Sequence, residues 1–472
     1  MFLDIDRREK NAIIGIDSYN THITYGEICS FVNNFEVTPR SVVFCLCEND
    51  IGAFAGFFAF IENKAVPLLL PEKMSKDMLS NLLKIYTPAY IWCRNNIADG
   101  FDYPCVFESY GYKLLRTDNE LYPLFDDLSM LLTTSGSTGS PKLVRHSYKN
   151  ISENPKNVAK FFGISEGCRA MADLPIHYTM GLSVICSHVS AGATVLLTSL
   201  SLMDMAYWDF FKEHKPTMFT GVPYSYEVLK RLRFTRNEHP ELEIITQGGG
   251  KLSEELYLEF ANYASNTGKK FIPTFGMTEC TARMAGLAPE LALEKVCAIG
   301  HAIPGGRLFL ADENGTEIAP NEIEATGEMG FEGPGVTLGY AECRDDLQKG
   351  DERFGRILTG DIAKRDASGV YFIQGRKTRF LKLLGFRINL DECEKLIKSE
   401  FLTDNACVGN DEKMIIYVEK QGIANQIPAF LSKQTGIGKP AFTAKEIVAL
   451  PRSPAGKVLY SELVLPFNTS TI

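Results

Sequence analysis

Short apolar runs alternate with amphipathic stretches over about the first hundred residues. Segments 41–47, 65–70 and 89–93 are β-branched and apolar, as buried strands are. Between them, segments 51–62 and 76–86 have the length and apolar spacing of helices. A strand–helix–strand–helix–strand order predicts a parallel sheet with helices packed on its faces.

The same alternation returns after residue 150. Strands are predicted over 194–198, 218–221, 244–247 and 271–275, and helices over 205–214, 224–234 and 254–264. Ser253 stands directly before the last of these helices, where its hydroxyl can satisfy a free N–H of the first turn. A second set of parallel strands covered by helices is therefore expected.

Beyond residue 300 the pattern changes to short apolar runs separated by turn sequences. Asn314-Gly315 stands between two such runs, and Ser368-Gly369 separates 362–364 from 370–373. Dipeptides of this kind are typical of the tips of hairpins. We expect this region to be antiparallel.

The C-terminal part has a third pattern. A helix over 390–400, two strands and a further helix predict a small α+β unit after about residue 376. The charged residues Arg376, Lys377 and Arg379 stand at the junction. Such a sequence suits an exposed joint between two domains.

Length and charge narrow the class of protein. The chain has 472 residues, 49 basic and 58 acidic, with a formal net charge of −9. This length predicts two or three domains, and the acidic balance argues against a nucleic-acid binder, which needs a strongly basic face. No apolar run approaches the roughly 18 residues of a membrane span, and the charged N-terminus lacks the apolar core of a signal peptide. We expect a cytoplasmic protein.

The cysteines also favour a cytoplasmic protein. The 12 cysteines are scattered among apolar neighbours, as in Phe44-Cys45-Leu46-Cys47, and none forms a C-x-x-C pair. Neither a zinc site nor a disulfide framework is expected from this spacing. Buried, reduced thiols in a cytosolic protein are the simpler interpretation.

The densest chemical signal lies between residues 133 and 142. Residues 134–141 hold five hydroxyl side chains and two glycines, and Lys142 follows. Glycines let backbone N–H groups turn toward an anion and hydroxyls add donors, so the segment could cradle a phosphate. It is not the Walker pattern, because Leu143 follows the lysine. By composition alone it could equally be a mobile loop leaving a strand at 128–132. The candidate residues are Thr134, Ser135, Gly136, Ser137, Thr138, Gly139 and Lys142.

The order of residues 134–144 resembles the phosphate loop of the adenylate-forming superfamily. This superfamily contains acyl-CoA synthetases, the adenylation domains of modular peptide synthetases, and firefly luciferase. Four further family motifs follow in the expected order: Phe275-Gly276-Met277-Thr278-Glu279, Thr359-Gly360-Asp361, Gly375-Arg376, and residues 450–457 with Lys457. The resemblance covers nearly the whole chain, and five ordered motifs are specific where any one alone is weak.

The resemblance implies an α/β fold in two domains. Residues 1–376 would form a large N-terminal adenylation domain of doubly wound sheets plus a distorted β-barrel region. Residues 377–472 would form a small, mobile C-terminal α+β lid domain, with the hinge near Thr378. Family members commonly have Asp or Lys at this hinge position and often an acid where Arg379 stands, and the small domain is short for the family.

The resemblance also implies roles at an ATP site. Glu279 would hold Mg²⁺ on the triphosphate, a hard oxygen on a hard cation, and Thr138 is assigned to the same metal site. Phe275 would pack on adenine, with Gly276, Met277 and Thr278 beside it. The glycines at 248, 249 and 250 (Gly248, Gly249, Gly250) would border the adenine and acyl sites, where only glycine permits a close approach.

Three further residues complete the implied catalytic set. Asp361 would accept hydrogen bonds from the ribose hydroxyls, and Arg376 would be a second ribose contact. Lys457 would reach the α-phosphate and the substrate carboxylate, where it neutralises developing charge. Taken singly, each of these could be a solvated surface residue, so the motifs carry the assignment.

The expected acyl pocket departs from the family pattern. Relatives usually have His where Tyr178 stands and an aromatic where His177 stands, and amino-acid-activating relatives have Asp at the Tyr178 position. An uncharged Tyr178 argues against an α-amino acid substrate. His177 could be a core histidine or a substrate contact. Tyr224 is the third residue assigned to this pocket.

The resemblance predicts an ATP-dependent carboxylic acid ligase. The enzyme would convert a small carboxylic acid to acyl-AMP and then pass the acyl group to a thiol, either coenzyme A or the phosphopantetheine of a carrier protein. Few residues follow Lys457 and no carrier domain is attached, so the acceptor would be a separate molecule such as an acyl carrier protein. The alternatives are an amino-acid-activating ligase for a stand-alone carrier protein and a catalytically idle nucleotide-binding homologue.

Overall fold

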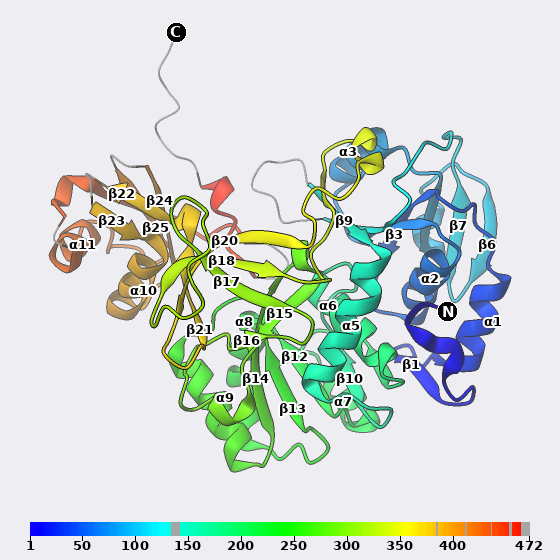
Figure 1. Cartoon of the computed structure of the whole chain (residues 1–472), viewed down its shortest axis with the longest axis horizontal. Helices are drawn as coiled ribbons and strands as arrows, with labels where there is room; N and C mark the ends of the chain where they lie inside the picture. The colour runs from blue at the N-terminus through cyan, green and yellow to red at the C-terminus, as the bar shows by residue number, and fades with distance from the viewer. Residues whose placement is uncertain (134–141, 384–385, 411–412, 436, 453–455, 464–472) are drawn as a thin grey trace, which may run out of the picture.

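The computed structural model of the chain (Figure 1) describes residues 1–133, 142–383, 386–410, 413–435, 437–452 and 456–463. Two large sheets, a four-stranded antiparallel sheet and a small C-terminal α+β part follow one another along the chain. The phosphate-loop candidates from Thr134 to Gly139 lie outside the described residues.

The eight-stranded sheet has parallel strands at its centre. Its order is β19-β9-β8-β4-β3-β5-β7-β6, and β3, β4, β5 and β8 pair in parallel. The strands are β3 (Val42–Cys47), β4 (Val66–Pro71), β5 (Tyr90–Arg94), β6 (Cys105–Ser109), β7 (Tyr112–Arg116), β8 (Leu128–Thr133), β9 (Leu143–Ser147) and β19 (Gly339–Ala341). The accompanying helices are α1 (Tyr25–Asn34), α2 (Ile51–Glu62), α3 (Lys76–Tyr86) and α4 (Asn95–Ala98).

The nine-stranded sheet repeats this plan. Its order is β16-β15-β14-β13-β12-β10-β11-β1-β2. The strands are β1 (Ile13–Asp17), β2 (His22–Thr24), β10 (Arg169–Ala172), β11 (Thr194–Leu197), β12 (Met218–Gly221), β13 (Ile244–Gln247), β14 (Lys270–Met277), β15 (Ala282–Gly286) and β16 (His301–Ala302). Its helices are α5 (Tyr148–Phe162), α6 (Thr179–Ser190), α7 (Met205–His214), α8 (Pro223–Arg231) and α9 (Glu254–Asn266).

The main core lies between the two large sheets. Helices α2, α5 and α6 fill this layer: α2 contacts β1 as well as β3, and α5 contacts both β8 and α6. Residues 51 to 61 of α2 are all buried, because the helix has no polar face to turn toward water. The outer helices cover the far faces, α3 on the first sheet and α7, α8 and α9 on the second.

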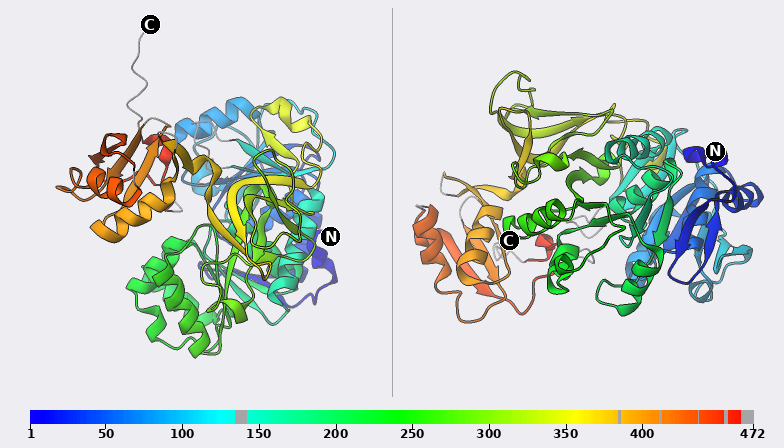
Figure 2. Two further views of the ribbon diagram at one scale, coloured as in Figure 1. Left: turned by 60° about the vertical axis from the view of Figure 1, so that its left-hand side comes forward. Right: turned by 90° about the horizontal axis from the view of Figure 1, so that it is seen from below.

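Beyond the second sheet the chain turns antiparallel, as the turn sequences predict. Strands β17 (Arg307–Ala311), β18 (Thr326–Glu332), β20 (Arg356–Arg365) and β21 (Tyr371–Arg376) form the four-stranded sheet. It stands apart from the two large sheets in the right-hand view of Figure 2 and occupies the region predicted as a distorted barrel. Gly369 at the β20–β21 turn has φ +79, the left-handed conformation that glycine adopts without strain.

The C-terminal part has its own apolar core, which includes Leu383, Ile397 and Phe442. Its elements are β22 (Phe380–Leu383), β23 (Phe386–Asn389), α10 (Leu390–Phe401), β24 (Asn405–Gly409), β25 (Met414–Val418), α11 (Ile427–Thr435) and β26 (Phe442–Glu446). Strand β26 pairs in parallel with β25, and β24 pairs antiparallel with it.

Some sequence predictions need correction. The helix predicted over 224–234 ends at Arg231, and a short 3₁₀ turn (Phe234–Arg236) follows it. The turn at Asn314-Gly315 exists, but only an isolated bridge joins Ala311 to Glu317, and the pairing strand β18 begins at Thr326.

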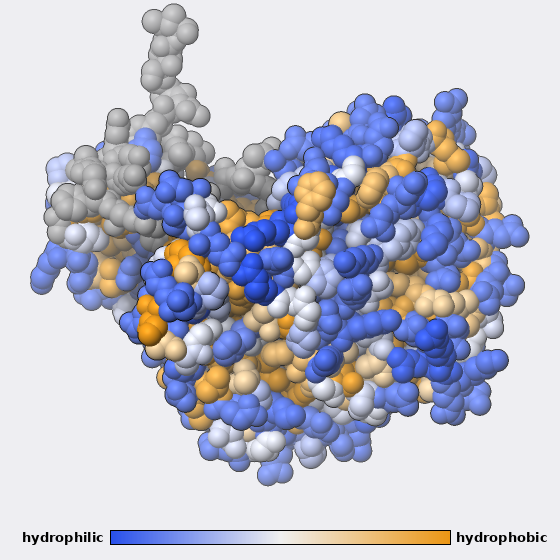
Figure 3. Space-filling view, in the orientation of Figure 1, coloured by the Kyte–Doolittle hydropathy of each residue, from blue (hydrophilic) through white to orange (hydrophobic). Residues whose placement is uncertain are grey.

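The cysteine prediction holds in part. All 12 cysteines are free thiols, and seven of them are buried. Cys29, Cys168 and Cys297 are partly buried, and Cys105 and Cys343 are exposed. Among the described residues, every helix is too short or too polar to cross a lipid bilayer. The face drawn in Figure 3 is mainly hydrophilic, with apolar side chains in small groups.

Candidate functional site

The predicted phosphate loop leaves and re-enters the eight-stranded sheet between two adjacent strands. Strand β8 ends at Thr133 and β9 begins at Leu143, antiparallel to it. Lys142, the described residue directly after the loop, has its Nζ 2.8 Å from Glu342 Oε1 and 5.7 Å from the centre of the Tyr340 ring. The end of the loop is therefore fixed beside Tyr340.

Glu279 lies beside the same tyrosine. It sits in a 3₁₀ turn, Thr278–Cys280, directly after β14. The Tyr340 hydroxyl donates a 2.7 Å hydrogen bond to Glu279 Oε1. Thr337 donates from both its N–H and its hydroxyl to the Glu279 carbonyl, each at 3.0 Å. Burial, together with the nearby Glu279 charge, raises the pKa of Tyr340 to about 12, so the tyrosine stays a hydrogen-bond donor at neutral pH.

Two positively charged side chains, Lys142 and Arg353, lie near the Tyr340 ring. The Arg353 guanidinium lies 4.5 Å from the centre of this ring, and Arg353 hydrogen-bonds the Thr337 hydroxyl. Neither Tyr340 nor Arg353 is predicted from the sequence. The signal that could have indicated this region is the run of glycines at 333, 335 and 339, just before the tyrosine, where backbone or side-chain atoms approach too closely for a larger residue. Lysine and arginine beside a carboxylate form a site for a polyanion with a bound cation.

One carboxylate suits magnesium at this position. No group of three or more His, Cys, Asp or Glu side chains that could hold a metal occurs among the described residues. Mg²⁺ usually keeps several waters and binds one or two carboxylates together with substrate phosphates. Glu279 provides such an oxygen, oriented through Tyr340.

Phe275, Gly276 and Met277 form the end of β14, where the strand pairs with β15. The register shifts between Phe275 and Gly276. A Cβ on Gly276 would lie 1.5 Å from the Ala282 carbonyl oxygen, so this bulge admits only glycine. Phe275 and Met277 are partly buried against the core that includes the four-stranded sheet.

Asp361 and Arg376 face each other across β20 and β21. They are direct cross-strand partners, and Arg376 Nε lies 3.1 Å from Asp361 Oδ1. Asp361 is only 4% exposed, whereas Arg376 is exposed. Burial raises the pKa of Asp361, and the Arg376 guanidinium opposes that shift. The pair therefore places a carboxylate that can accept hydrogen bonds beside the long, exposed, positively charged side chain of Arg376.

Lys457, from the C-terminal part, lies near enough to this pair for both charges to act on its pKa. Its Nζ lies 5.9 Å from the centre of the Tyr178 ring. The residue is exposed, yet protein atoms around the ammonium desolvate it and lower its pKa; Arg376 lowers it further and Asp361 opposes the change. A Cβ on the neighbouring Gly456 would lie 3.3 Å from Tyr224 Cβ, so this loop rests on α8.

The three glycines after β13 pack tightly against the predicted acyl pocket. A Cβ on Gly249 would lie 2.7 Å from the Tyr178 hydroxyl oxygen, and one on Gly248 would lie 2.5 Å from Met180 Cε. Gly250 approaches Pro223 in the same way, at 2.9 Å. Gly249 also has φ +75. Larger residues here would have to displace these side chains, and the expected role of the glycines beside adenine and the acyl group stays a prediction.

His177 and Tyr178 precede α6, and both are partly buried. Burial lowers the pKa of His177 to about 4, so its imidazole is neutral at pH 7. Its Nδ1 is buried and has no hydrogen-bond partner among the described residues. Tyr224 is 53% exposed at the start of α8.

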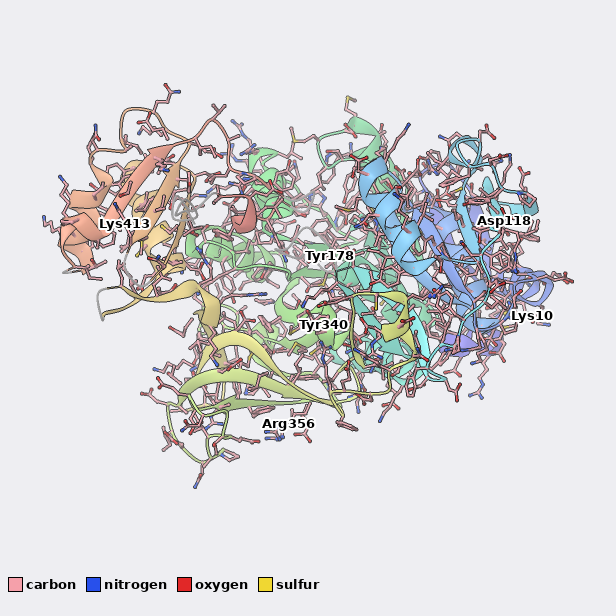
Figure 4. The ribbon with its side chains drawn as sticks, turned by 90° about the horizontal axis from the view of Figure 1, so that it is seen from above. Lys10, Asp118, Tyr178, Tyr340, Arg356 and Lys413 are labelled. Carbon is pink, nitrogen blue, oxygen red and sulfur yellow. The ribbon has the colours of Figure 1, made fainter. Side chains whose placement is uncertain are left out.

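The predicted site residues therefore fall into two neighbouring groups. Lys142 and Glu279 both lie beside Tyr340. Lys457 and Gly249 both lie beside Tyr178, at the start of α6, and the charges of the Asp361–Arg376 pair act on Lys457. In Figure 4, Tyr178 and Tyr340 both lie near the middle of the view, between the small part that carries Lys413 and the N-terminal part that carries Lys10 and Asp118.

Solved coenzyme A ligases have the same fold. O-succinylbenzoate coenzyme A synthetase from Bacillus subtilis, in complex with ATP and a magnesium ion, gives a TM-score of 0.78 at 21% identity, covering 98% of each chain. ATP-bound MatB from Rhodopseudomonas palustris gives 0.77 at 19% identity, also covering 98% of each chain. The protein thus has the fold of the adenylate-forming enzymes.

Sequence comparison identifies the family to which the chain belongs. Residues 7–341 match the family described as AMP-binding enzyme, and the chain belongs to this family. The 2-succinylbenzoate–CoA ligase of Bacillus velezensis is 26% identical over 357 residues, which cover 73% of this chain and 70% of the relative.

Proposed function

We propose that this protein is an ATP-dependent ligase that joins a small carboxylic acid to a thiol through an acyl-adenylate. Its family and its relatives, which are acid–CoA ligases, support this activity. The observation that carries the proposal for this chain is the position of Lys457, whose Nζ lies 5.9 Å from the Tyr178 ring centre and near enough to the Asp361–Arg376 pair for their charges to act on its pKa. These residues come from three separate regions of the sequence and have no shared structural need to converge.

The first half-reaction joins the acid to AMP. A carboxylate oxygen attacks the α-phosphorus of ATP, the bond to the β-phosphate oxygen breaks, and pyrophosphate leaves. Asp361 accepts hydrogen bonds from the ribose hydroxyls with Arg376 beside it, and Phe275 and the glycine stretch border the adenine. Lys457 stabilises the negative charge that grows on the phosphorus oxygens in the transition state.

The triphosphate binds where positive charge gathers near Tyr340. Lys142 and Arg353 are placed to contact phosphate oxygens, together with the loop from Thr134 to Gly139. A magnesium ion, when bound with ATP, would neutralise phosphate charge. Glu279 is the carboxylate that would hold it, and Tyr340 fixes the direction of that carboxylate through its hydrogen bond. Thr138 remains the second residue proposed for this metal.

The second half-reaction transfers the acyl group. A thiolate attacks the acyl carbon, the carbon–oxygen bond to AMP breaks, and AMP leaves. Splitting the condensation in this way replaces one difficult step by two easier ones. The relatives favour coenzyme A as the acceptor, and the phosphopantetheine of a carrier protein is the alternative thiol.

The proposal includes a division of the chain into residues 1–376 and 377–472. The separate apolar core after residue 380 supports it, as does the 3₁₀ turn Lys377–Arg379, which contains the proposed hinge residue Thr378. Rotation about this turn would let one small domain present different faces to one site. Amino-acid activation is the less favoured alternative, because Tyr178 offers no charge to an ammonium group.

The experiment is a panel of carboxylic acids scored for pyrophosphate release from ATP, first without and then with coenzyme A. We expect release that depends on the acid, and AMP with acyl-CoA when coenzyme A is added. Adenylate formation without transfer to coenzyme A would point to a carrier protein instead. Exchange supported by amino acids alone would favour the alternative function. ATP binding without any acid-dependent release would make the protein an idle homologue.

A further inference from the structure

Arg283 on β15 is an arginine side chain buried inside the large part of the molecule. It is 0% exposed. Its Nη1 donates to Ser183 Oγ at 3.0 Å and its Nη2 to Thr220 Oγ1 at 3.2 Å. The guanidinium lies 5.1 Å from the centre of the Phe162 ring. Its Nε has no partner among the described residues.

No carboxylate of the described chain balances this charge. The other fully buried arginine in the described residues, Arg145, pairs with Glu352. Burial lowers the pKa of Arg283 to about 10, which leaves it protonated at neutral pH. Two neutral hydroxyls and an aromatic face compensate a buried cation only in part, because a buried charge is stable mainly when it is paired.

Arg283 lies next to the proposed acyl pocket. It pairs across the strands with Gly276, the glycine of the motif that ends β14. Ser183 lies in the first half of α6, the helix that begins directly after Tyr178. Through Ser183, Arg283 therefore contacts α6 little more than one helical turn after Tyr178. The Ser183 side chain also lines a small internal cavity with Thr179 and Thr281.

A second polar group without a partner lies on the same side of the sheet. Thr246 is the register partner of Thr220 in the parallel pair β12–β13, so both side chains leave the same face. The Thr246 hydroxyl is buried and has no hydrogen-bond partner among the described residues. A guanidinium and a free hydroxyl at the carboxyl ends of parallel strands can together bind an anion.

We infer that the acid activated by this enzyme carries a second anionic group, which binds Arg283 while the reacting carboxylate meets Lys457. The inference rests on the proposed function and specifies its substrate class: a short dicarboxylic acid, or an acid with a comparable distal anion. Lys457 Nζ lies 5.9 Å from the centre of the Tyr178 ring, and Arg283 bonds Ser183, which follows Tyr178 by little more than one turn of α6. One small molecule could therefore span both.

The test compares acids in matched pairs that differ only in the distal charge. Malonate is paired with propanoate, succinate with butanoate, and glutarate with pentanoate, each scored by pyrophosphate release. A site built around a polar partner rejects the analogue that lacks it, so we expect kcat/KM to be at least about 100-fold higher for one or more dianions. Arg283→Met should remove this preference, and Arg283→Lys should restore part of it.

A control separates charge recognition from folding. Arg365 is a buried arginine whose Nη2 donates to two carbonyl groups, those of Ala319 and Glu322, away from the proposed pocket. Arg365→Met should leave the ratio of dianion to monoanion unchanged, whatever it does to stability. Thermal unfolding and ATP binding are measured for every variant, so that the ratio is compared only between folded proteins.

The outcomes distinguish this inference from the function on which it rests. Monoanions used as well as or better than dianions, or an unchanged ratio in folded Arg283→Met, would overturn the inference while leaving acid activation established. If Arg283→Met and Arg283→Lys both fail to fold, the ratio of kcat/KM for dianions to that for monoanions in the wild-type enzyme decides whether the substrate carries a second anion. Pyrophosphate release with none of these six acids would overturn the inference, and the proposed function would fall only if the wider panel of carboxylic acids also gave no release.

Discussion

Lys457 and Tyr178 are separated by most of the chain, yet the Lys457 Nζ lies 5.9 Å from the centre of the Tyr178 ring. The lysine comes from the loop after β26, and the tyrosine from the residue before α6. This contact brings the C-terminal part onto the proposed acyl pocket. We propose that this is the arrangement in which the acid is adenylated.

Replacing Lys457 by alanine should therefore abolish acyl-adenylate formation. The lysine is proposed to stabilise the transition state of that step alone, because the leaving group of the second step already exists once the adenylate has formed. The variant should still transfer a chemically supplied acyl-adenylate to its thiol. Quenched-flow assays of the two half-reactions measure both effects. Lys433→Ala, an exposed lysine on α11, is the matched control and should leave both steps unchanged. Equal loss of both steps in folded Lys457→Ala would mean that the lysine has a general structural role.

A proline at Thr378 should have the opposite effect. Proline fixes φ near −65° and removes an N–H, so it restricts rotation at the proposed hinge. We expect adenylation to be spared and thiol transfer to be slowed, because only the second step needs the other arrangement of the small domain. The same pair of assays applies. Normal transfer in this variant would remove Thr378 from the hinge.

Glu279→Gln should lower the rate of adenylation by at least about 100-fold, the scale on which one charge-stabilising group is felt. The change keeps the shape of the side chain and its acceptor for the Tyr340 hydroxyl, but removes the charge. Adenylation is measured as a function of magnesium concentration. Glu290→Gln, an exposed residue in a neighbouring 3₁₀ turn, is the control. An unchanged magnesium dependence in Glu279→Gln would exclude this residue as the metal ligand.

Tyr178→Ala should change which acids are used while leaving ATP binding nearly intact. The Tyr178 ring packs against Leu174, Met180 and Val222, and its hydroxyl stands above Gly249. Removing the ring enlarges the acyl pocket without touching Asp361 or Arg376. The measurement is kcat/KM over an acid panel, with Tyr178→Phe as the variant that keeps the ring. A uniform loss across all acids, or weaker ATP binding, would place Tyr178 elsewhere in the mechanism.

Arg379 anchors the start of the C-terminal part, where relatives often have an acid. Its Nε lies 2.7 Å from Asp391 Oδ1, its Nη2 bonds Glu394, and its guanidinium covers the Tyr460 ring at 3.9 Å. Burial raises the pKa of Glu394, and Arg379 opposes that shift. Arg379→Met should leave this largely buried carboxylate without a cationic partner, although Cys407 N–H and the Tyr460 hydroxyl still donate to it, at a cost of about 3 kcal/mol in the stability of the C-terminal part. Urea unfolding tests this, and the double variant with Glu394→Gln should recover part of the loss.

Acid should destabilise the protein in part through buried histidines, of which His188 is the clearest. The side chain is 0% exposed, its Nδ1 donates to the Val184 carbonyl at 2.8 Å, and burial lowers its pKa to about 4. The unfolded chain binds this proton near pH 6.5, so stability falls as pH drops from about 6.5 toward 4. Between pH 7 and pH 5 this amounts to about 2 kcal/mol.

Urea unfolding of wild type and His188→Asn at the two pH values isolates this contribution. The variant should lose less stability between pH 7 and pH 5. Asp173, whose pKa burial raises to about 7, contributes with the opposite sign in both proteins and cancels in the comparison. Parallel losses in the two proteins would contradict the assignment.

The sequence predicted the elements that have a clear period or a clear stop signal. The helices over 51–62 and 76–86 have the bounds of α2 and α3, and Ser253 accepts a hydrogen bond from Leu256 N–H at the start of α9. Helix α6 was missed because it is buried on every side and so has no polar face to reveal its period. Helix α5 was also missed, because it contains Pro155, and proline inside a sequence usually indicates the end of a helix.

The residues of the candidate site also fall into those that the sequence could name and those that it could not. Residues in ordered motifs, such as Glu279, Asp361 and Lys457, could be named from the sequence, although their roles remain predictions. Tyr340 and Arg283 could not, because each acts through partners far along the chain: Tyr340 through Glu279, and Arg283 through Ser183 and Thr220. Contacts of this kind are set by the packing of the sheets, which no local pattern reports.

The central claim is that a carboxylate oxygen attacks the α-phosphorus of ATP, and the most direct test follows that oxygen. An accepted acid labelled with ¹⁸O in its carboxylate is incubated with ATP, magnesium and coenzyme A, and the products are analysed by mass spectrometry. The account predicts that one labelled oxygen appears in AMP and none in pyrophosphate. Label in inorganic phosphate with ADP as the nucleotide product, or AMP without label, would contradict it.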